Sequence, residues 1–452
     1  MQDTVLAKIV ADKYEWVSKH KRLKPLASFL HQVMPSTRSF YHALSGAKKV
    51  FILECKKASP SNGLIRANFD PVAIAGVYRP YASAISVLTD EKHFQGSFDF
   101  LHQVSRTVSQ PVLCKDFIID PWQIYLARLY QADAILLMLS VLDDDTYRKL
   151  AEVSHRLQMG VLTEVISEKE RQRAISLKAK VVGINNRDLR DLSIDLNRTR
   201  TLGPKLPAGV TVISESGINN YCQVRELSHY ANGFLIGSAL MREPELTLAL
   251  DRILLGDNKV CGLTRAADAQ AARAVGALYG GLIFVPGSPR YLEADMARAV
   301  IAGATLRYVG VFRDAPVSDV AARANLLSLS AVQLHGDEDQ PYIDALRQVL
   351  PPKCHIWKAL DMRHPLPARD LTQVDRYVLD NGGGHGKPFD WSLLNGMILD
   401  NVMLAGGLDA DNCAAAASLG CVGLDFNSGV ESTPGIKDYQ KLATVFQILR
   451  AY

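Results

Sequence analysis

The sequence predicts two closed (β/α)₈ barrels in tandem, an α/β fold in which eight parallel strands alternate with helices, twice over. Three observations predict it: sixteen short runs rich in β-branched residues, longer helix-like segments between them, and a chain of 452 residues, which is long for one compact core. The runs begin roughly 20 to 34 residues apart, enough for one strand, one helix and two loops. Near-continuous apolar runs suit parallel strands buried on both faces, and eight such units close a barrel within about 200 to 250 residues.

The predicted strands fall into two sets of eight, separated near Gly256. The first set covers residues 50–56, 84–90, 111–117, 134–139, 160–165, 181–187, 210–217 and 233–239. The second set covers residues 258–264, 279–285, 307–312, 331–336, 355–360, 376–381, 401–408 and 421–429. We therefore expect domains at residues 1–256 and 257–452. An open doubly wound sheet fits less well, because it usually has fewer strands and a Gly-rich first turn, and no GxGxxG motif occurs.

The roughly 49 residues before the first predicted strand form an extension of the first barrel. Leu6, Ile9 and Val10 lie at helical spacing in it. We expect this segment to form a helix that docks over one end of the barrel.

Composition and charge exclude several classes of protein. The net charge of +4 is spread along the chain, without the basic and aromatic blocks of a nucleic-acid binder. No apolar stretch approaches the ~20 residues of a membrane span, and the N-terminus lacks a signal-peptide pattern. The seven cysteines form no CxxC pair, and no HExxH motif occurs. We expect a cytoplasmic monomer with reduced thiols, no metal, and no nucleic-acid or membrane partner.

The predicted strands of the first half end in polar residues, and barrel enzymes place their sites at these C-terminal ends. Glu54 and Lys56 end strand one, two residues apart and therefore on one side. Lys115, Glu164 and Asn185 end strands three, five and six. Any one of them could belong to a structural ion network. Five together favour acid–base chemistry, because Lys and Glu are rarely buried without partners.

The last two strands of each half end in small residues. In the first half these are Ser214-Glu215-Ser216-Gly217 and Ile236-Gly237-Ser238, and in the second Ala405-Gly406-Gly407 and Asp425-Phe426-Asn427-Ser428-Gly429. Small residues there let backbone N–H groups approach a phosphate. The paired arrangement predicts a phosphate site in each barrel.

The second half carries a different set of reactive groups. Cys261 ends its first strand and Asp380 its sixth, so a thiolate base and a carboxylic acid could move protons from opposite sides of one barrel mouth. His335 follows strand four and Arg290 follows strand two. Taken singly, Cys261 could be a small core residue and His335 a hydrogen-bonded structural histidine.

These motifs, in this order, resemble two known families. The first half resembles indole-3-glycerol phosphate synthase in Glu54-Cys55-Lys56-Lys57-Ala58-Ser59-Pro60-Ser61, Lys115-Asp116-Phe117, Thr163-Glu164-Val165, Gly183-Ile184-Asn185-Asn186-Arg187-Asp188-Leu189 and Ser214-Glu215-Ser216-Gly217-Ile218. The second half resembles phosphoribosylanthranilate isomerase in Val260-Cys261-Gly262-Leu263-Thr264, Gln333-Leu334-His335-Gly336, Phe389-Asp390-Trp391-Ser392 and Asn427-Ser428-Gly429-Val430-Glu431. The resemblance covers essentially the whole chain, and the fused order is similar to that of enteric bacteria.

For the second barrel, the resemblance implies isomerisation of N-(5-phosphoribosyl)anthranilate to 1-(2-carboxyphenylamino)-1-deoxyribulose 5-phosphate. Asp380 would be the general acid that opens the ribose ring, and Cys261 the base at C2′. A thiol must be partly ionised to act as a base, so we expect a lowered pKa at Cys261. The substrate and its phosphate would contact Arg290, His335, Gly406, Gly407, Asp425, Ser428 and Gly429.

For the first barrel, it implies closure of that ketone onto the aromatic ring, with loss of carbon dioxide and water. Lys115 would donate a proton at the carbonyl and Glu164 would serve the dehydration, while the share of Lys56 in the acid role stays open. Glu54 and Asn185 would position and polarise the substrate. Binding contacts would come from Ser59, Ser61, Arg187, Glu215, Ser216, Gly217, Gly237 and Ser238. Small phosphorylated substrates and no cofactor are expected, and His385, in a glycine-rich segment that fits a flexible lid, has no assigned role.

Two other functions compete with this interpretation. Lys115 or Lys56 could form a Schiff base in an aldolase acting on a phosphosugar. Alternatively, a barrel that has lost its chemistry could bind a phosphorylated metabolite or act as a scaffold, since fold alone does not fix function. The tandem motifs disfavour the first alternative, and the complete acid–base sets disfavour the second.

Overall fold

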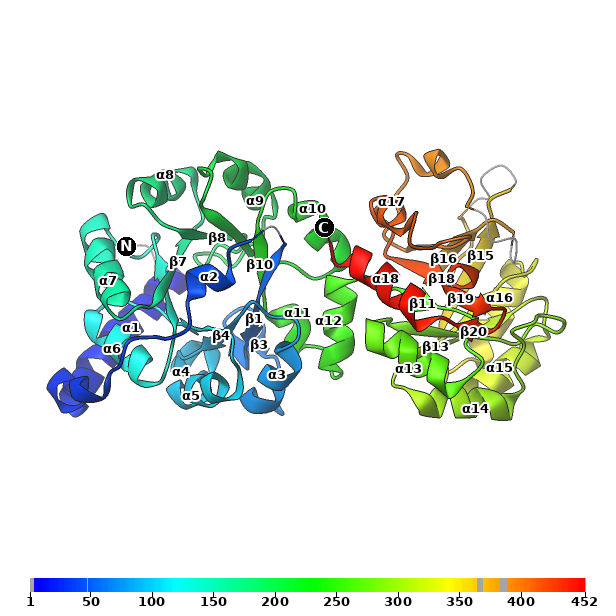
Figure 1. Cartoon of the computed structure of the whole chain (residues 1–452), viewed down its shortest axis with the longest axis horizontal. Helices are drawn as coiled ribbons and strands as arrows, with labels where there is room; N and C mark the ends of the chain where they lie inside the picture. Colours follow the sequence, from blue (N-terminus) through cyan, green and yellow to red (C-terminus); the bar gives the residue numbers. More distant parts are fainter. Residues whose placement is uncertain (1–3, 47, 364–368, 383–387, 452) are drawn as a thin grey trace. The chain divides into compact units, whose positions relative to one another are not determined.

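The computed structural model describes residues 4–46, 48–363, 369–382 and 388–451. The chain forms two compact units, Met1–Asn219 with Glu226–Ala249 and Asn220–Arg225 with Leu250–Tyr452. Each unit contains one closed barrel of eight parallel strands, with helices around it (Figure 1). The predicted fold class is therefore confirmed for both halves of the chain.

The first barrel closes because β1 pairs with both β10 and β4. Its strands follow the order β1-β10-β9-β8-β7-β6-β5-β4, and each lies within a run predicted from the sequence. The strands are β1 (Val50–Cys55), β4 (Ala84–Leu88), β5 (Val112–Lys115), β6 (Ala134–Met138), β7 (Gly160–Val165), β8 (Val181–Asn185), β9 (Thr211–Glu215) and β10 (Gly233–Ile236).

Helices connect these strands, and several begin at a side chain that caps them. Asp120 caps α6 in a capping box with Gln123, and Asp143 caps α7. The helices are α3 (Pro71–Tyr78), α4 (Glu91–Phe94), α5 (Phe98–Thr107), α6 (Pro121–Leu129), α7 (Asp144–Arg156), α8 (Glu168–Ser176), α9 (Asn197–Leu202), α10 (Tyr221–Leu227), α11 (Ser238–Met241) and α12 (Leu246–Leu254). A small hairpin that we did not predict, β2 (Ala58–Ser59) with β3 (Gly63–Leu64), follows β1.

The N-terminal extension forms α1 (Val5–Leu23), which covers the C-terminal end of the first barrel. Leu6 and Ile9 join the barrel's hydrophobic core. The buried Lys13 ammonium lies 2.6 Å from Asp90 and 2.7 Å from Asp116, the residues that follow β4 and β5. The helix predicted over one barrel end is thus confirmed, and that end is the one that carries the polar residues.

The extension also closes the opposite end of the same barrel. Phe40, the first residue of α2 (Phe40–Ala43), is 1% exposed and lies against the start of β7. A Cβ on Gly160 would stand 2.7 Å from the Phe40 side chain, so only glycine leaves room for the ring. The extension therefore packs against both ends of the first barrel.

The second barrel closes through the pairing of β11 with β18. Its strands follow chain order around the ring. They are β11 (Lys259–Val260), β12 (Tyr279–Ile283), β13 (Arg307–Phe312), β14 (Ala331–Leu334), β15 (His355–Asp361), β16 (Arg376–Asp380), β17 (Val402–Leu404) and β18 (Gly423–Phe426). All eight coincide with predicted runs, although β11 and β17 are much shorter than predicted.

The helical ring of the second barrel is less regular than the sequence pattern predicts. In the described part of the segment between β15 and β16 there is no α-helix, and a 3₁₀ turn, Trp391–Leu394, lies between β16 and β17. A second unpredicted hairpin, β19 (Glu431–Thr433) with β20 (Ile436–Lys437), follows β18. The helices are α13 (Ala266–Val275), α14 (Ala294–Gly303), α15 (Val317–Leu326), α16 (Gln340–Val349), α17 (Cys413–Ala417) and α18 (Tyr439–Leu449).

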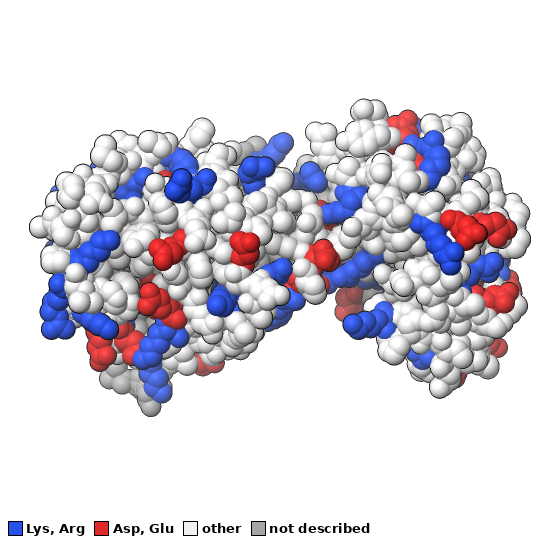
Figure 2. Space-filling view, turned by 90° about the horizontal axis from the view of Figure 1, so that it is seen from below, with Lys and Arg blue, Asp and Glu red and all other residues white. Residues whose placement is uncertain are grey.

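The surface carries charges of both signs. On the face shown in Figure 2, Lys and Arg side chains lie interspersed with Asp and Glu side chains among uncharged residues. Within the described ranges, no helix has both the length and the apolar character needed to cross a membrane.

Candidate active sites

The first barrel gathers its predicted acid–base residues at one mouth. Glu54 lies near the end of β1, Lys115 ends β5, Glu164 lies in β7 and Asn185 ends β8. All four line one cavity together with Lys56, which follows β1. The five residues that the sequence pattern singled out therefore converge, because parallel strands bring their carboxyl ends to one end of the barrel.

Lys115 lies at the centre of a group of carboxylates in this cavity. Its Nζ is 3.7 Å from a carboxylate oxygen of Glu215 and 3.9 Å from one of Glu164. Lys56 forms a separate, closer ion pair with Glu54, at 2.7 Å, so the two residues lie on the same side, as the period-two alternation predicted. Glu215, which we expected among the binding residues, thus belongs to the same charged cluster as Lys115.

The pKa values of this cluster are shifted in different directions. Burial lowers the pKa of Lys115, but the surrounding carboxylates outweigh burial, so the ammonium form is favoured. Burial raises the pKa of Glu54, but Lys56 and Lys115 outweigh it and the net shift is downward. Burial raises the pKa of Glu215 to about 8 against the attraction of Lys115. A protonated and an ionised carboxyl group can therefore coexist at neutral pH.

In the loops after β9 and β10, the backbone packs closely against neighbouring side chains. Ser216 and Gly217 have φ values of +64° and +78°. A Cβ on Gly217 would lie 2.6 Å from Ile194, and one on Gly237 would lie 2.5 Å from a Glu54 oxygen. The predicted binding residues that line the cavity here are Ser59, Ser61, Arg187, Glu215, Ser216, Gly217, Gly237 and Ser238.

Two arginines face the same cavity. Arg187 was predicted from the sequence, whereas Arg242, which follows α11, was not. Burial and the neighbouring Arg242 charge both lower the pKa of Arg187. Two guanidinium groups that line one cavity favour the binding of an anion there. Sequence spacing could not show this pairing, because Arg242 lies beyond the strand end that we searched.

The second barrel brings its predicted residues to one cavity as well. Cys261 follows β11, His335 follows β14 and Asp380 ends β16. The Nε2 atom of His335 lies 3.3 Å from Oδ2 of Asp380. Although burial raises the pKa of Asp380, its contact with His335 outweighs burial and the net shift is downward.

The expected lowering of the Cys261 pKa is wrong for the substrate-free structure. The thiol is 5% exposed, and its burial raises its pKa, although the neighbouring Lys259 acts in the opposite direction. Burial disfavours a thiolate for the same reason that it disfavours any charge. Burial therefore acts against ionisation of Cys261 in the substrate-free structure.

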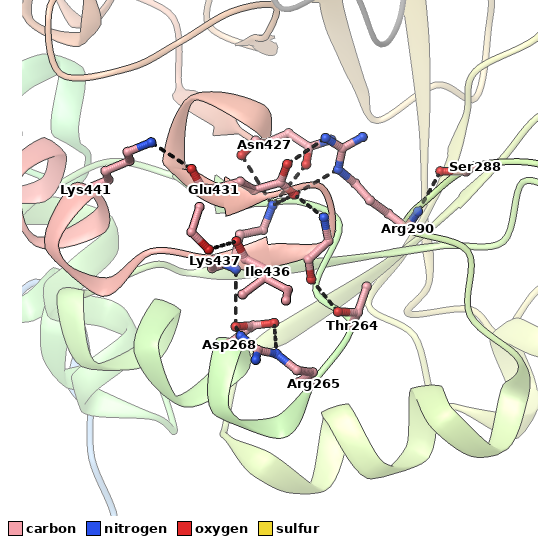
Figure 3. Close-up of polar contacts among 12 residues, drawn as sticks. Thr264, Arg265, Asp268, Ser288, Arg290, Asn427, Glu431, Ile436, Lys437 and Lys441 are labelled. Carbon is pink, nitrogen blue, oxygen red and sulfur yellow. Dashed lines mark hydrogen bonds and ion pairs between the residues drawn. The ribbon is translucent and has the colours of Figure 1, made fainter.

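Arg290 is held in place by a hairpin that the sequence analysis did not predict (Figure 3). Its Nε and Nη2 atoms donate to the two carboxylate oxygens of Glu431, at 2.8 and 2.6 Å. Glu431 also accepts a 2.8 Å hydrogen bond from Lys437. Lys437 is buried and reaches Asn427 as well. The bidentate pair fixes the guanidinium at the rim of the cavity.

The loops after β17 and β18 form the remaining wall of this cavity. Gly406 and Gly407 have positive φ values, +90° and +64°, which suit glycine. The predicted residues that line the cavity are Cys261, Arg290, His335, Asp380, Gly406, Gly407, Asp425 and Ser428. Gly429 is not among them: it packs against the Leu408 backbone, where a Cβ would collide with the carbonyl oxygen.

Asp425, which was predicted to contact the substrate, also forms a buried ion pair. One of its oxygens accepts a 2.6 Å bond from the buried Lys259, whereas the other is buried and has no hydrogen-bond partner in the described chain. Within the same residues, no group of three His, Cys, Asp or Glu side chains is placed to hold a metal ion. His385 lies outside the described residues.

Both halves of the chain match known families. Residues 6–253 match the family model of indole-3-glycerol phosphate synthase, and residues 258–448 match that of N-(5'phosphoribosyl)anthranilate (PRA) isomerase. The chain is 68% identical to the tryptophan biosynthesis protein TrpCF of Salmonella typhi, over 99% of this chain and 100% of that protein. The proteins of the same name from Yersinia pestis and Vibrio cholerae are 67% and 58% identical over 99% of this chain, and the matches cover 95% and 96% of those proteins.

Proposed function

The chain belongs to the indole-3-glycerol phosphate synthase and phosphoribosylanthranilate isomerase families, joined in one polypeptide, and from this premise we propose which residues carry out each reaction. It is a bifunctional enzyme of tryptophan biosynthesis. The second barrel isomerises N-(5-phosphoribosyl)anthranilate to 1-(2-carboxyphenylamino)-1-deoxyribulose 5-phosphate. The first barrel converts that product to indole-3-glycerol phosphate, with loss of carbon dioxide and water. Domain limits at residues 1–256 and 257–452 agree with the two matched ranges and belong to the proposal.

In the isomerase barrel, Asp380 is the general acid and Cys261 the general base. Asp380 protonates the ribose ring oxygen, the ring opens to a Schiff base, and Cys261 then takes the proton from C2′. Free Asp380 favours its ionised form, so it needs a change of environment to hold a proton. Bound substrate supplies that change, because it excludes water from the mouth and adds the negative charges of its carboxylate and phosphate. Arg290, which Glu431 orients, binds the substrate carboxylate, and His335 contacts Asp380.

In the synthase barrel, Lys115 is the general acid. Its ammonium group is favoured by its carboxylate neighbours and faces the cavity, where it protonates the carbonyl oxygen that the aromatic ring attacks. Glu164 takes the proton whose removal completes the dehydration. Glu54 holds Lys56 at 2.7 Å, so Lys56 binds the substrate carboxylate as an oriented cation before that group leaves as carbon dioxide. Asn185 positions the substrate.

Each barrel binds its substrate's phosphate at the loops after its last two strands. In the first barrel Ser61, Ser216, Gly217, Gly237 and Ser238 line that side of the cavity. In the second barrel Gly406, Gly407 and Ser428 do so. Backbone N–H groups at such loops bind an anion without needing a cationic side chain.

The observation that carries the assignment is the separation of two different acid–base sets, one in each barrel. Lys115 with carboxylates can donate a proton to a carbonyl, whereas a thiol facing a carboxylic acid can move a proton from carbon to oxygen. We also propose that the enzyme is a cytoplasmic monomer. The free state of all seven cysteines supports a reducing compartment, and equilibrium sedimentation tests the monomer.

The assignment is tested by a fluorescence assay that follows consumption of phosphoribosylanthranilate and formation of indole-3-glycerol phosphate. Lys115→Ala should stop only the second step, and Asp380→Ala only the first. If either variant keeps the step assigned to it, the roles proposed here are wrong. Trapping of substrate on wild-type protein by borohydride, lost in Lys115→Ala, would instead favour a Schiff-base aldolase.

A further inference from the structure

Lys259 is a fully buried cation beneath the mouth of the second barrel, and the proposed mechanism does not use it. It is the first residue of β11, and its ammonium group is 0% exposed. Nζ lies 2.6 Å from Oδ2 of Asp425 on β18 and 3.0 Å from Oε1 of Gln333 on β14. A lysine is costly to bury, so its position inside a barrel calls for a compensating role.

The thiol of Cys261 faces this ammonium group. Cys261 follows Lys259 by two residues, and the charge of Lys259 acts on the Cys261 thiol. Gly281 on β12 leaves room for both: a Cβ there would stand 2.6 Å from the sulfur and 2.9 Å from Cε of Lys259. Lys259 thus donates to Asp425 and Gln333, and the sulfur of Cys261 lies on the same side of the barrel interior.

The other charges that face Cys261 are largely neutralised by their own partners. They are Asp425 on β18, Lys437 on β20 and Arg290 after β12. Arg290 and Lys437 share the carboxylate of Glu431. Asp425 is paired with Lys259 itself. The cation that acts most strongly on the sulfur is therefore Lys259, and an ammonium group near a thiol favours its ionised form.

Gln333, the second partner of Lys259, is connected through His335 to Asp380, the proposed general acid. An ammonium group can only donate, so Gln333 must turn its Oε1 toward Lys259 and its Nε2 toward His335. The amide Nε2 also can only donate, so Nδ1 of His335, 3.2 Å away, must accept. A neutral His335 therefore carries its proton on Nε2, which donates to Asp380 at 3.3 Å.

We propose that Lys259 is a positioning residue that sets the protonation states of both acid–base groups of the isomerase barrel. Its ammonium group stabilises the thiolate of Cys261. Through Gln333, it also fixes the tautomer of His335 that donates a hydrogen bond to Asp380. The inference rests on the proposed roles of Cys261 and Asp380. During turnover the proton from C2′ passes to the sulfur, and Lys259 keeps its own proton throughout.

The first test measures ionisation of Cys261 in the full chain without substrate. Alkylation by iodoacetamide is followed against pH, and the Cys261 peptide is quantified by mass spectrometry. In Lys259→Met the pH midpoint should rise by about one unit or more, because an adjacent cation depresses the pKa of an acid by that amount. Lys358→Met is the matched control: it removes another buried lysine of the same barrel, paired with Glu338 at 2.8 Å, and should leave the midpoint unchanged.

A second variant keeps the test valid if Lys259→Met does not fold. Lys259→Met combined with Asp425→Leu replaces the buried ion pair by apolar groups, a change that folded proteins often tolerate. The midpoint of Cys261 should still rise in it, because the nearby ammonium group is lost. An unchanged midpoint in a folded variant that lacks Lys259 overturns the proposal.

The tautomer is tested by imidazole ¹⁵N chemical shifts, with the His335 signals identified by their loss in His335→Asn. Wild type should show an unprotonated Nδ1 and a protonated Nε2, and the Lys259→Met/Asp425→Leu variant should show a mixture of the two tautomers. A protonated Nδ1 in wild type overturns the relay. Neither measurement uses substrate, so both are independent of whether Cys261 acts as the base, which Cys261→Ser tests in the isomerase assay.

Discussion

The two barrel mouths share one fold and one location but connect their reactive groups differently. In the first barrel, Lys115 lies 3.7 and 3.9 Å from the carboxylates of Glu215 and Glu164, so the proposed acid and base influence each other directly. In the second barrel, Cys261 and Asp380 are linked by side chains that stand between them. A barrel mouth can therefore set protonation states either by direct contact or through buried positioning residues.

The difference follows from the length of the side chains that carry the groups. Glu164 and Glu215 lie on β7 and β9, on either side of β8, and Lys115 reaches them across the mouth from β5. Cys261 follows β11 and Asp380 ends β16, three strands away around the closed ring, and both side chains are too short to reach across the mouth as Lys115 does. Gln333 on β14 and His335 after it supply that connection.

The largest effects are expected from removing one proton-transfer group in each barrel. Glu164→Gln should lower the synthase kcat by about 10²- to 10⁴-fold, because a general base contributes that much to rate. It should leave the isomerase rate unchanged. Cys261→Ser should do the reverse. Separate assays of the two half-reactions check this, and loss of both activities in either variant would contradict independent sites.

A large loss of stability is expected from breaking the buried contact that fastens the extension to the first barrel. Lys13→Met leaves Asp90 and Asp116 buried without their cation, which should cost about 3 to 5 kcal/mol of unfolding free energy. Urea unfolding, followed together with synthase activity, measures this. Among the residues the structure describes, the second barrel has no helix fastened in the way that α1 is. In Lys13→Met, isomerase activity should therefore survive at urea concentrations that abolish synthase activity.

Lys21→Met is the matched control on the same helix. Lys21 pairs with Asp120 at 2.8 Å, but its side chain is 44% exposed. Exposed ion pairs contribute about 0 to 1 kcal/mol. A loss in Lys13→Met no larger than that in Lys21→Met would show that the triad does not fasten the helix.

The strands and their polar ends could be predicted from the sequence because both depend on local pattern. Apolar runs predicted all sixteen barrel strands, and strand ends predicted the convergence of Glu54, Lys56 and Lys115 in one cavity. The docking of α1 was predictable for the same reason, since Leu6 and Ile9 repeat at helical spacing.

The positioning residues could not be predicted, because their roles depend on contacts between distant segments. Lys259 appears in the sequence as an ordinary strand residue, and only the closed barrel brings it to Asp425, 166 residues away. Glu431 ended a recognised motif, but its partner Arg290 lies 141 residues earlier. The pKa of Cys261 was predicted in the wrong direction, because the sequence does not indicate how far a thiol is buried from water.

A moderate effect is expected from loosening Arg290. Glu431→Gln keeps the shape of the side chain but removes the charge that holds the guanidinium, and hydrogen bonds to charged groups contribute about 1.5 to 3 kcal/mol. The isomerase KM should rise about tenfold or more while kcat changes little, because Arg290 binds substrate and does not transfer a proton. An equal fall in kcat would instead place Arg290 in the reaction itself.

The smallest effect is expected from Glu215→Gln, and its sign depends on pH. Folding raises the pKa of Glu215 from 4.5 to about 8, so between these values the folded protein holds a proton that the unfolded chain releases. Wild-type stability must therefore fall as pH rises through this window. Glutamine has no proton to lose, so the Tm of Glu215→Gln relative to wild type should increase from pH 5 to pH 9, by about 2 to 4 °C for each kcal/mol.

Glu54→Gln is the control of opposite sign in the same cavity. The pKa of Glu54 is lowered on folding by Lys56 and Lys115, which outweigh burial, so its ionised form stabilises the folded protein. That contribution is present above the ordinary carboxyl pKa and is lost as pH falls through the lowered folded value. Glu54→Gln should therefore be less stable than wild type at pH 7, and the difference should shrink toward acid pH. If both variants shifted in the same direction with pH, the two carboxyl groups could not hold the opposite protonation states that this mouth requires.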